Sequence, residues 1–478
     1  MKLANLIKNQ KGIIATKGNL EIDIKSLSQK AVTKVKEGLF FCINGVNFDG
    51  HNFYKSAIQN GCVALVVDRW LDTPQPQILV QNVRDFVPLL CKKFFKNVQN
   101  KLKLIGVTGT NGKTTTSNLV YQILKNDDIK AGLIGTNGIE FESTNLPNSM
   151  TTPDTIDLFY LFNEMYKNGV THIVMEVPAH ALFLNKLLGL KFDIGIFTNF
   201  SQDHLDFFKS MQNYANAKCL FFDKKLCKNA VINIDDDLGK TISQKTNCNL
   251  FTYGILSPAT NFAMDIIDKR EGTSFLLNIF DNIFDIKSNL CCVFNVYNML
   301  ASAVCAKILG VSNDAIFKTF SNVKNIDGRM NFYALKNGAT VVIDYAHTPE
   351  SLKAVLISLR KYTTNRIISV FGCGGDRDQD KRKKMGEFAS QFADFTFLTS
   401  DNPRNESPKK IIFQIVKGFK KNNYIFYTNR KKAILKALKF SKKDDIILIA
   451  GKGHEKFQEI KGKKYDFDDF EIVKPFIV

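Results

Sequence analysis

The sequence lacks several features that mark particular classes of protein. It has no C-x-x-C pair, and its ten cysteines are scattered over 478 residues with no histidines grouped near them. This spacing argues against a disulfide framework and a zinc site, so we expect free thiols in a reducing compartment. No run of about 18 apolar residues occurs, and the start of the chain has no apolar stretch of signal-peptide length. We therefore expect a cytoplasmic protein with no membrane insertion.

Acidic residues are scarce relative to basic ones, because 46 Asp and Glu stand against 65 Lys and Arg, for a net charge of +19. A basic arm or stripe would indicate a nucleic-acid binder, but these lysines are spread along the whole chain, so we expect no nucleic-acid partner. Two interpretations of the excess stay open. The lysines are either simply solvated, or they create a positive field that attracts small anionic substrates.

Alternating strand-like and helical patterns indicate the fold class. With 45% hydrophobic residues the chain can form two to four domains. Short apolar runs that predict strands are found at 38–43, 63–67, 77–80, 104–108, 173–176, 194–199, 341–344, 367–371, 395–398 and 446–450. Several of the later runs end in polar clusters, as is typical of open, mostly parallel α/β sheets that carry function at the strand C-termini.

We therefore predict three α/β domains with an active site in the clefts between them. Residues 1–100 form a small N-terminal α/β domain. Residues 101–328 form a central P-loop ATPase-like domain with a parallel sheet, and residues 329–478 form a C-terminal Rossmann-like α/β domain.

A glycine-rich turn follows the strand predicted at 104–108 and precedes a helical pattern. Such a turn at a helix N-terminus is suited to bind phosphate, with Lys113 reaching the terminal phosphates and the Thr114 hydroxyl on magnesium. The predicted ATP-binding residues of this loop are Gly109, Thr110, Asn111, Gly112, Lys113, Thr114 and Thr115. The spacing departs from the general P-loop, because Val107 stands where that pattern has its first glycine.

This shortened loop, Thr-Gly-Thr-Asn-Gly-Lys-Thr-Thr at 108–115, resembles the ATP loop of the Mur ligases and of the folylpolyglutamate synthases. Over nearly all its length the chain most resembles the Mur ligases that add diaminopimelate or lysine. The resemblance implies a monomeric ATP-dependent ligase that forms an amide bond through an acyl phosphate. Its implied substrates are ATP, UDP-N-acetylmuramoyl-L-alanyl-D-glutamate and meso-diaminopimelate. The resemblance also implies that residues 1–100 bind the UDP-linked substrate and that residues 329–478 bind the amino acid.

Transfer of a phosphoryl group to a carboxylate requires cations, so hard oxygen ligands for Mg²⁺ are expected near the loop. Glu176 ends an apolar strand, where an unpaired carboxylate would be costly, which favours a metal ligand over a surface charge. The resemblance adds His204, in Asp-His-Leu-Asp, at a second magnesium. It also implies that Lys218 reacts with carbon dioxide and ligates metal as a carbamate. Catalytic roles are therefore predicted for Lys113, Glu176, His204 and Lys218.

Further nucleotide contacts are implied by the resemblance alone. Asn295 and Asn298 match an adenine-side helix, and Arg329 lies at the start of the last domain, where it is expected to contact phosphate. Asp344 and His347 match a nucleotide-facing loop, although Asp and His at a strand end often only cap the next helix.

The acceptor site departs from the family pattern. Ser28, Thr151, Thr152 and Lys186 are the residues predicted to contact the UDP-linked substrate. Leu27 and Gln29 replace two residues of the uridine-recognising Asp-Ser-Arg, whereas 47–53 keeps the family pattern. Further departures are found at Pro178 and Ala179, which replace two serines, and at Leu184 and Lys186, where Gln and Arg are usual.

The amino-acid site is predicted from Asp-Asn-Pro-Arg at 401–404, which resembles the motif of the diaminopimelate-adding enzymes. Arg404 is expected to bind the far carboxylate of diaminopimelate, which lysine lacks, with Arg377 as a second candidate. Glu455 suits the distal ammonium. The full predicted set is Arg377, Asp401, Asn402, Pro403, Arg404, Gly451 and Glu455. In an alternative interpretation, Asp401 and Arg404 only pair with each other.

Three other functions are also compatible with the sequence. A lysine-adding enzyme would share nearly every motif. A folylpolyglutamate synthase would use the same loop but would lack Asp-Asn-Pro-Arg. A non-catalytic nucleotide-binding paralogue is suggested by the altered acceptor loops, although the presence of Lys113, Glu176, His204 and Lys218 favours an active enzyme.

Overall fold

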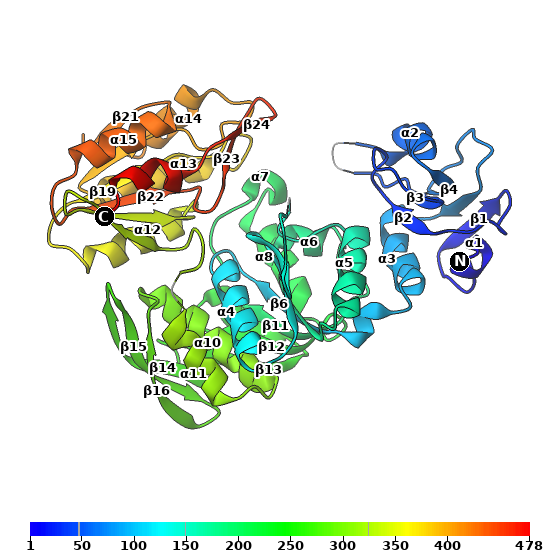
Figure 1. Ribbon diagram of the computed structural model, residues 1–478, viewed down its shortest axis with the longest axis horizontal. Helices are drawn as coiled ribbons and strands as arrows, with labels where there is room; N and C mark the ends of the chain where they lie inside the picture. The colour runs from blue at the N-terminus through cyan, green and yellow to red at the C-terminus, as the bar shows by residue number, and fades with distance from the viewer. Residues whose placement is uncertain (46–47, 149, 324) are drawn as a thin grey trace. The chain divides into compact units, whose positions relative to one another are not determined.

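The computed structural model describes residues 1–45, 48–148, 150–323 and 325–478 (Figure 1). Asn47, in the family-like stretch at 47–53, lies outside the described residues. The chain divides into two compact units. Unit 1 comprises 1–106, 129–195 and 220–229, and unit 2 comprises 107–128, 196–219 and 230–478. Strands β6 (Lys103–Thr108), β11 (Phe192–Phe197) and β12 (Cys227–Asn233) have residues in both units.

The N-terminal part of unit 1 is a small sheet with the strand order β1-β5-β4-β3-β2. Its strands are β1 (Ile13–Lys17), β2 (Ser26–Ser28), β3 (Gly38–Phe41), β4 (Cys62–Val67) and β5 (Gln77–Val80). The helices are α1 (Leu3–Ile7), η1 (Gly50–Phe53), α2 (Tyr54–Gln59), α3 (Val83–Phe94) and η2 (Val98–Lys101). Strands β2 to β5 pair in parallel, and all four residues of β3 are buried.

The rest of unit 1 continues in a second sheet, in which the strand order is β11-β6-β10-β7-β8-β9. The additional strands are β7 (Ala131–Gly135), β8 (Gly138–Phe141), β9 (Thr144–Leu146) and β10 (His172–Glu176). The helices are α5 (Thr155–Lys167), α6 (Ala179–Phe183) and η3 (Leu220–Phe222). Every residue of β10 is buried, so this strand brings the Glu176 carboxylate into the interior at its C-terminal end.

Unit 2 begins with the helix α4 (Lys113–Asn126), which follows the glycine-rich loop. Its strands form the order β16-β15-β14-β13-β12, with β13 (Asn249–Gly254), β14 (Asn261–Lys269), β15 (Gly272–Ile279) and β16 (Asn282–Ser288). The helices are α7 (Leu205–Phe208), α8 (Met211–Cys219), α9 (Asp237–Lys245), α10 (Val293–Ile308) and α11 (Asn313–Asn322). The helix has a buried apolar face, which includes Leu119, Val120, Ile123 and Leu124.

The C-terminal part of unit 2 has a sheet with the order β17-β18-β22-β19-β20-β21. Its strands are β17 (Asn331–Ala334), β18 (Thr340–Asp344), β19 (Ile367–Phe371), β20 (Phe395–Leu398), β21 (Tyr424–Phe426) and β22 (Ile446–Ala450). The remaining elements are α12 (Pro349–Arg360), α13 (Asp380–Phe392), α14 (Pro408–Val416), α15 (Arg430–Phe440), α16 (Asp469–Val473), η4 (Lys474–Phe476) and the hairpin of β23 (Phe457–Ile460) and β24 (Lys463–Asp466).

Both faces of this C-terminal sheet are covered. In β22, Ile446 and Leu448 pack into one hydrophobic cluster with residues of α12 and α13, whereas Ile447 and Ile449 pack into a second cluster with residues of α15. Strands buried on both faces read as continuous apolar runs, which explains the sequence 446–450. The prediction of parallel α/β sheets is confirmed. No helix among the described residues is both long and apolar enough to cross a membrane.

Candidate active site

The glycine-rich loop lies in unit 2 between the end of β6 and α4. Its backbone requires glycine at two positions. Gly109 and Gly112 have φ values of +145° and +83°, in the region that favours glycine. A Cβ atom on Gly109 would lie 1.9 Å from Oγ1 of Thr198, and one on Gly112 would lie 2.5 Å from Oδ1 of Asn298. The tight packing of both glycines therefore fixes the path of the loop at the start of α4.

Lys113, the first residue of α4, folds back over this loop. Its Nζ donates hydrogen bonds to the carbonyl oxygens of Gly109 (3.0 Å) and Thr110 (2.8 Å). The loop is also tied to the residues after β11, because the Asn111 amide donates to Oδ1 of Asn199 (2.9 Å). The ammonium group thus lies at the loop, where phosphate oxygens could replace the two carbonyl acceptors.

Thr114 contacts the residues that begin the C-terminal part of unit 2. Nη2 of Arg329 donates to Oγ1 of Thr114 at 2.9 Å, and the guanidinium lies over the Tyr345 ring at 4.5 Å. Asp344 accepts hydrogen bonds from the amides of Met330 (2.9 Å) and Ala346 (2.7 Å), while its burial raises the pKa of the carboxyl. Asp344 therefore holds the backbone next to Arg329 and next to Tyr345.

The predicted adenine-side residues lie on α10, which packs against α4. Asn298 accepts a hydrogen bond from Oγ1 of Thr116 (3.2 Å) and donates to Oδ1 of Asn295 (3.0 Å). Thr115 is buried on the same helix as Thr116. The two asparagines are thus part of a buried polar network that joins α10 to the helix of the phosphate loop.

Asp203 is a central residue that our sequence reasoning missed. Its carboxylate lies 3.3 Å from His204 Nε2, 3.5 Å from His347 Nε2 and 3.3 Å from Lys381 Nζ. Burial by itself would raise the pKa of this carboxyl, but the charges of Lys381, His204 and His347 outweigh it and hold the pKa well below its usual value. His204 has a positive φ of +57° at the start of α7. One buried anion therefore brings together His204, predicted at a second magnesium, and His347, predicted to face the nucleotide.

Lys218 lies on α8 and is only 1% exposed. Its Nζ is 4.7 Å from the centre of the Tyr214 ring. Burial, and after it the positive charge of Lys113, holds the pKa of this amine well below its usual value. These surroundings favour the neutral amine over the ammonium form.

Glu176 lies in unit 1, where residues 136, 151 and 152 surround it. Its carboxylate accepts hydrogen bonds from the amide (2.8 Å) and hydroxyl (3.1 Å) of Thr136. Thr152 donates its hydroxyl to the Glu176 carbonyl oxygen at 2.7 Å, and the Thr151 hydroxyl lies 3.2 Å from that of Thr136. At Gly135 a Cβ atom would lie 2.5 Å from Oε1 of Glu176, so the strand end is shaped around this carboxylate.

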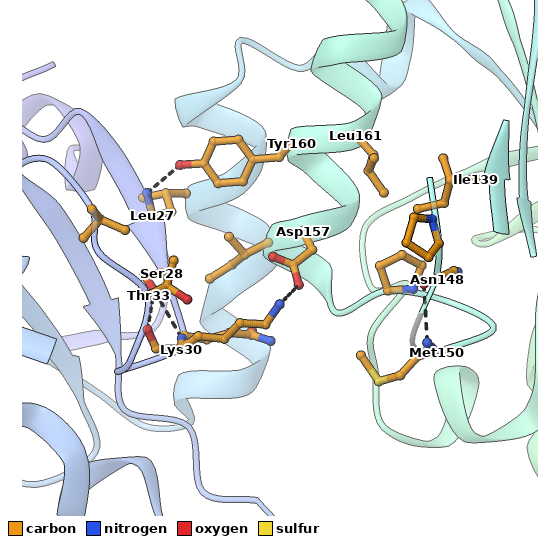
Figure 2. Close-up of a pocket in the computed structure, with 15 residues that line it drawn as sticks. Leu27, Ser28, Lys30, Thr33, Ile139, Asn148, Met150, Asp157, Tyr160 and Leu161 are labelled. Atoms are coloured by element: carbon orange, nitrogen blue, oxygen red, sulfur yellow. Dashed lines mark hydrogen bonds and ion pairs between the residues drawn. The ribbon is translucent and has the colours of Figure 1, made fainter. Parts of the chain in front are cut away.

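Unit 1 also contains a cavity of about 480 Å³ (Figure 2). Its lining includes Leu27, Ser28 and Gln29 from the N-terminal part, and Met150 and Pro153 from the second part. Thr151, Thr152 and Lys186 are not among its described lining residues. Of the predicted UDP-contact residues, Ser28 therefore lines the cavity, whereas Thr151 and Thr152 lie beside Glu176.

Two lining residues of α5 were not predicted from the sequence. The Tyr160 hydroxyl accepts a hydrogen bond from the Leu27 amide at 2.9 Å, and Asp157 pairs with Lys30 at 2.6 Å (Figure 2). These two contacts join residues that are 133 and 127 positions apart in the sequence, so no local motif indicates them.

The altered acceptor loop has its own contacts. Lys186 forms an ion pair with Asp154 at 2.6 Å. Pro178 precedes α6, Ala179 begins it, and Leu184 follows it.

The predicted amino-acid residues form one cluster in unit 2. Nδ2 of Asn402 donates to Oε2 of Glu455 (2.8 Å), and the buried Lys452 donates to the same oxygen (2.8 Å) and to Oδ1 of Asn402 (3.1 Å). Gly451 is adjacent, because a Cβ there would lie 2.8 Å from Oδ2 of Asp401.

The alternative interpretation of Asp401 and Arg404 is wrong, since these two residues do not pair. Asp401 Oδ1 accepts from the Asn402 amide at 2.6 Å, whereas Arg404 Nε donates to Glu459 at 3.0 Å. Pro403 lies between them and is buried. The side chain of Arg377 is 53% exposed and lies 3.8 Å from Asp206.

In the part of the chain that the structure describes, no three His, Cys, Asp or Glu side chains are grouped to hold a metal ion.

Comparisons with known proteins find family matches and full-length relatives. The Mur ligase middle domain matches residues 107–306, and the Mur ligase glutamate ligase domain matches residues 328–453. The UDP-N-acetylmuramoyl-L-alanyl-D-glutamate--2,6-diaminopimelate ligase of Clostridium tetani is 38% identical, over 100% of this chain and 99% of that protein. The ligase of the same name from Caldanaerobacter subterraneus is 40% identical over the same shares.

A solved structure of a ligase with that name has a TM-score of 0.69 at 28% identity, and the match covers 99% of this chain and 98% of that one. The family matches and the full-length relatives lead to one conclusion. The chain belongs to the Mur ligase family.

Proposed function

We propose that this chain is the ATP-dependent ligase that joins meso-diaminopimelate to UDP-N-acetylmuramoyl-L-alanyl-D-glutamate in peptidoglycan precursor synthesis. The observation that carries the proposal is the match over the full chain to relatives named for that reaction. The cluster of Asn402, Arg404 and Glu455 supports it, because these groups are suited to bind a carboxylate and an ammonium.

The reaction would begin at the phosphate loop. Nζ of Lys113 would leave the carbonyl oxygens of the loop and bind phosphate oxygens of ATP. Arg329 would neutralise phosphate charge beside Thr114. Transfer of the γ-phosphoryl group to the D-glutamyl γ-carboxylate gives an acyl phosphate. The amine of the amino acid then attacks the acyl carbon, and the tetrahedral adduct expels inorganic phosphate as the amide bond forms.

Magnesium fits the chemistry of the predicted donors. It would neutralise charge on the transferring phosphoryl group. The proposed ligands are Thr114, Glu176, His204 and Lys218. Lys218 would contribute as a carbamate, formed when its neutral amine attacks carbon dioxide and loses a proton. The burial that lowers the pKa of Lys218 supports this modification. The two hydroxyls that fix Glu176 keep its carboxylate at the end of β10.

The nucleotide end of the acceptor would enter the cavity of unit 1. Ser28 lines it, and Tyr160 fixes the Leu27 backbone beside it. Thr151, Thr152 and Lys186 would then contact the sugar-peptide portion. We also propose that the protein acts in the cytoplasm, because all ten cysteines are free, as in a reducing compartment.

Phosphate release tests this function. The protein is incubated with ATP, Mg²⁺ and the UDP-linked dipeptide, with and without meso-diaminopimelate. We expect ADP and inorganic phosphate only when all components are present, and at least about a hundredfold loss in Lys113→Ala, which lacks a cation at the loop. Formation of AMP and pyrophosphate, or equal turnover of lysine, would contradict the proposal.

A further inference from the structure

Arg404 already has an anionic partner within the protein. Its Nε donates to Oε2 of Glu459 at 3.0 Å, and its Nη1 donates to the carbonyl oxygen of Gly375 at 2.7 Å. The side chains of Arg404 and Glu459 are 20% and 28% exposed, so the pair is largely but not fully withdrawn from water. Arg404 therefore has an anion beside it even when the ligand lacks a far carboxylate.

Backbone contacts hold Glu459 beside Arg404. The Arg404 amide donates to the Glu459 carbonyl oxygen (3.1 Å), and the Glu459 amide donates to Oδ1 of Asn402 (3.0 Å). The next residue of β23, Ile460, forms a parallel bridge with Arg404. Strand β23 therefore fixes the Glu459 carboxylate at one edge of the guanidinium.

One nitrogen of the Arg404 guanidinium, Nη2, is left to bind a ligand. A guanidinium has five N–H donors in a planar fork, and the two contacts above use Nε and Nη1. Among the described residues, Nη2 of Arg404 has no hydrogen-bond acceptor in the structure. A substrate carboxylate that binds there would share one cation with Glu459.

We infer that Glu459 is a specificity-determining residue, which acts by neutralising Arg404 before the amino acid binds. The inference rests on the proposed function. Because Glu459 supplies a negative charge, a lysine substrate would not leave Arg404 unpaired, which lowers the penalty against lysine. The same charge repels the far carboxylate of diaminopimelate. Glu459 therefore lowers the preference for diaminopimelate over lysine in two ways, because it favours lysine and opposes diaminopimelate.

Glu459→Gln separates charge from shape, because glutamine keeps an acceptor for Arg404 Nε and removes the negative charge. We expect KM for meso-diaminopimelate to fall and kcat/KM for lysine to fall, each by at most about fivefold, as suits a partly exposed pair. KM for ATP should stay unchanged. Since a carboxylate is restored in Glu459→Asp, that variant should return toward the wild-type preference.

Glu471→Gln is the matched control, because it removes one negative charge from an exposed side chain of α16 that pairs only loosely with Lys474 (3.5 Å). It should leave the preference unchanged. A Glu459→Gln enzyme that folds and turns over, but shows an unchanged or weaker preference for diaminopimelate, would overturn the inference alone. A wild type with no diaminopimelate-dependent turnover would overturn the proposed function and this inference with it.

Discussion

Lys218 has surroundings that favour a neutral amine, since its side chain is buried on α8 near the positive charge of Lys113. If it acts as a carbamate, Lys218→Ala removes an anion from the site while the small side chain leaves space behind. We expect turnover to fall by at least about a hundredfold, and formate or acetate to restore part of it by supplying a carboxylate in that space. Phosphate release with and without the acid measures the effect.

Lys225→Ala is the control for this prediction, because Lys225 is exposed. It should retain full turnover and gain nothing from either acid. A Lys218→Ala enzyme with near-normal activity would show that the carbamate assignment is wrong. Loss of activity without rescue, together with an intact fold, would leave a positioning role as the better explanation.

Among the secondary-structure elements, α15 and α16 are joined by a buried ion pair. Arg430 donates to both carboxylate oxygens of Asp469, at 2.8 and 2.6 Å, and also to the carbonyl oxygen of Ala450 at the end of β22. Removing one partner leaves the other charge buried. We expect Arg430→Met to lower the free energy of unfolding by about 3–5 kcal/mol. Urea unfolding measures this loss.

The double variant Arg430→Met with Asp469→Leu tests the cause. It replaces both charges with apolar side chains of similar size, so most of the lost stability should return. If the double variant is as unstable as Arg430→Met alone, the loss comes from the contact with Ala450 or from packing, and the buried-charge explanation is wrong.

The elements predicted from the sequence are those with strong local signals. The apolar runs at 367–371, 395–398 and 446–450 are β19, β20 and β22. Strands β14 to β16 were missed, because they form an antiparallel meander with a half-exposed face, as in the pattern of Asn261–Lys269. In such a segment polar residues interrupt the apolar run that marks a buried strand.

The candidate site shows the same division between local and long-range information. The loop 109–112 could be predicted because its glycines and lysine are consecutive in the sequence. Glu459 could not, since it meets Arg404 only when the hairpin β23–β24 packs against a loop 55 residues earlier. Asp203 was part of a recognised motif, but its role depends on Lys381, which is 178 residues away in the sequence.

For the whole molecule, the net charge of +19 gives a test of the two interpretations left open by the composition. A positive field attracts anionic substrates over distances that salt screens, and the screening length falls from about 30 Å at 0.01 M to about 8 Å at 0.15 M. UDP-N-acetylmuramoyl-dipeptide carries several negative charges, whereas diaminopimelate is neutral overall. Steering should therefore act on the first substrate and not on the second.

We expect kcat/KM for the UDP-linked substrate to fall about threefold to tenfold between about 0.01 and 0.15 M KCl, with kcat nearly constant. The kcat/KM for diaminopimelate should change by less than about twofold over the same salt range. Steady-state kinetics at fixed magnesium, with sucrose added in parallel as an uncharged solute, measure both. If the two constants respond equally to salt, the lysines do not steer the nucleotide substrate, and the excess of basic residues is a solvated surface without a part in substrate capture.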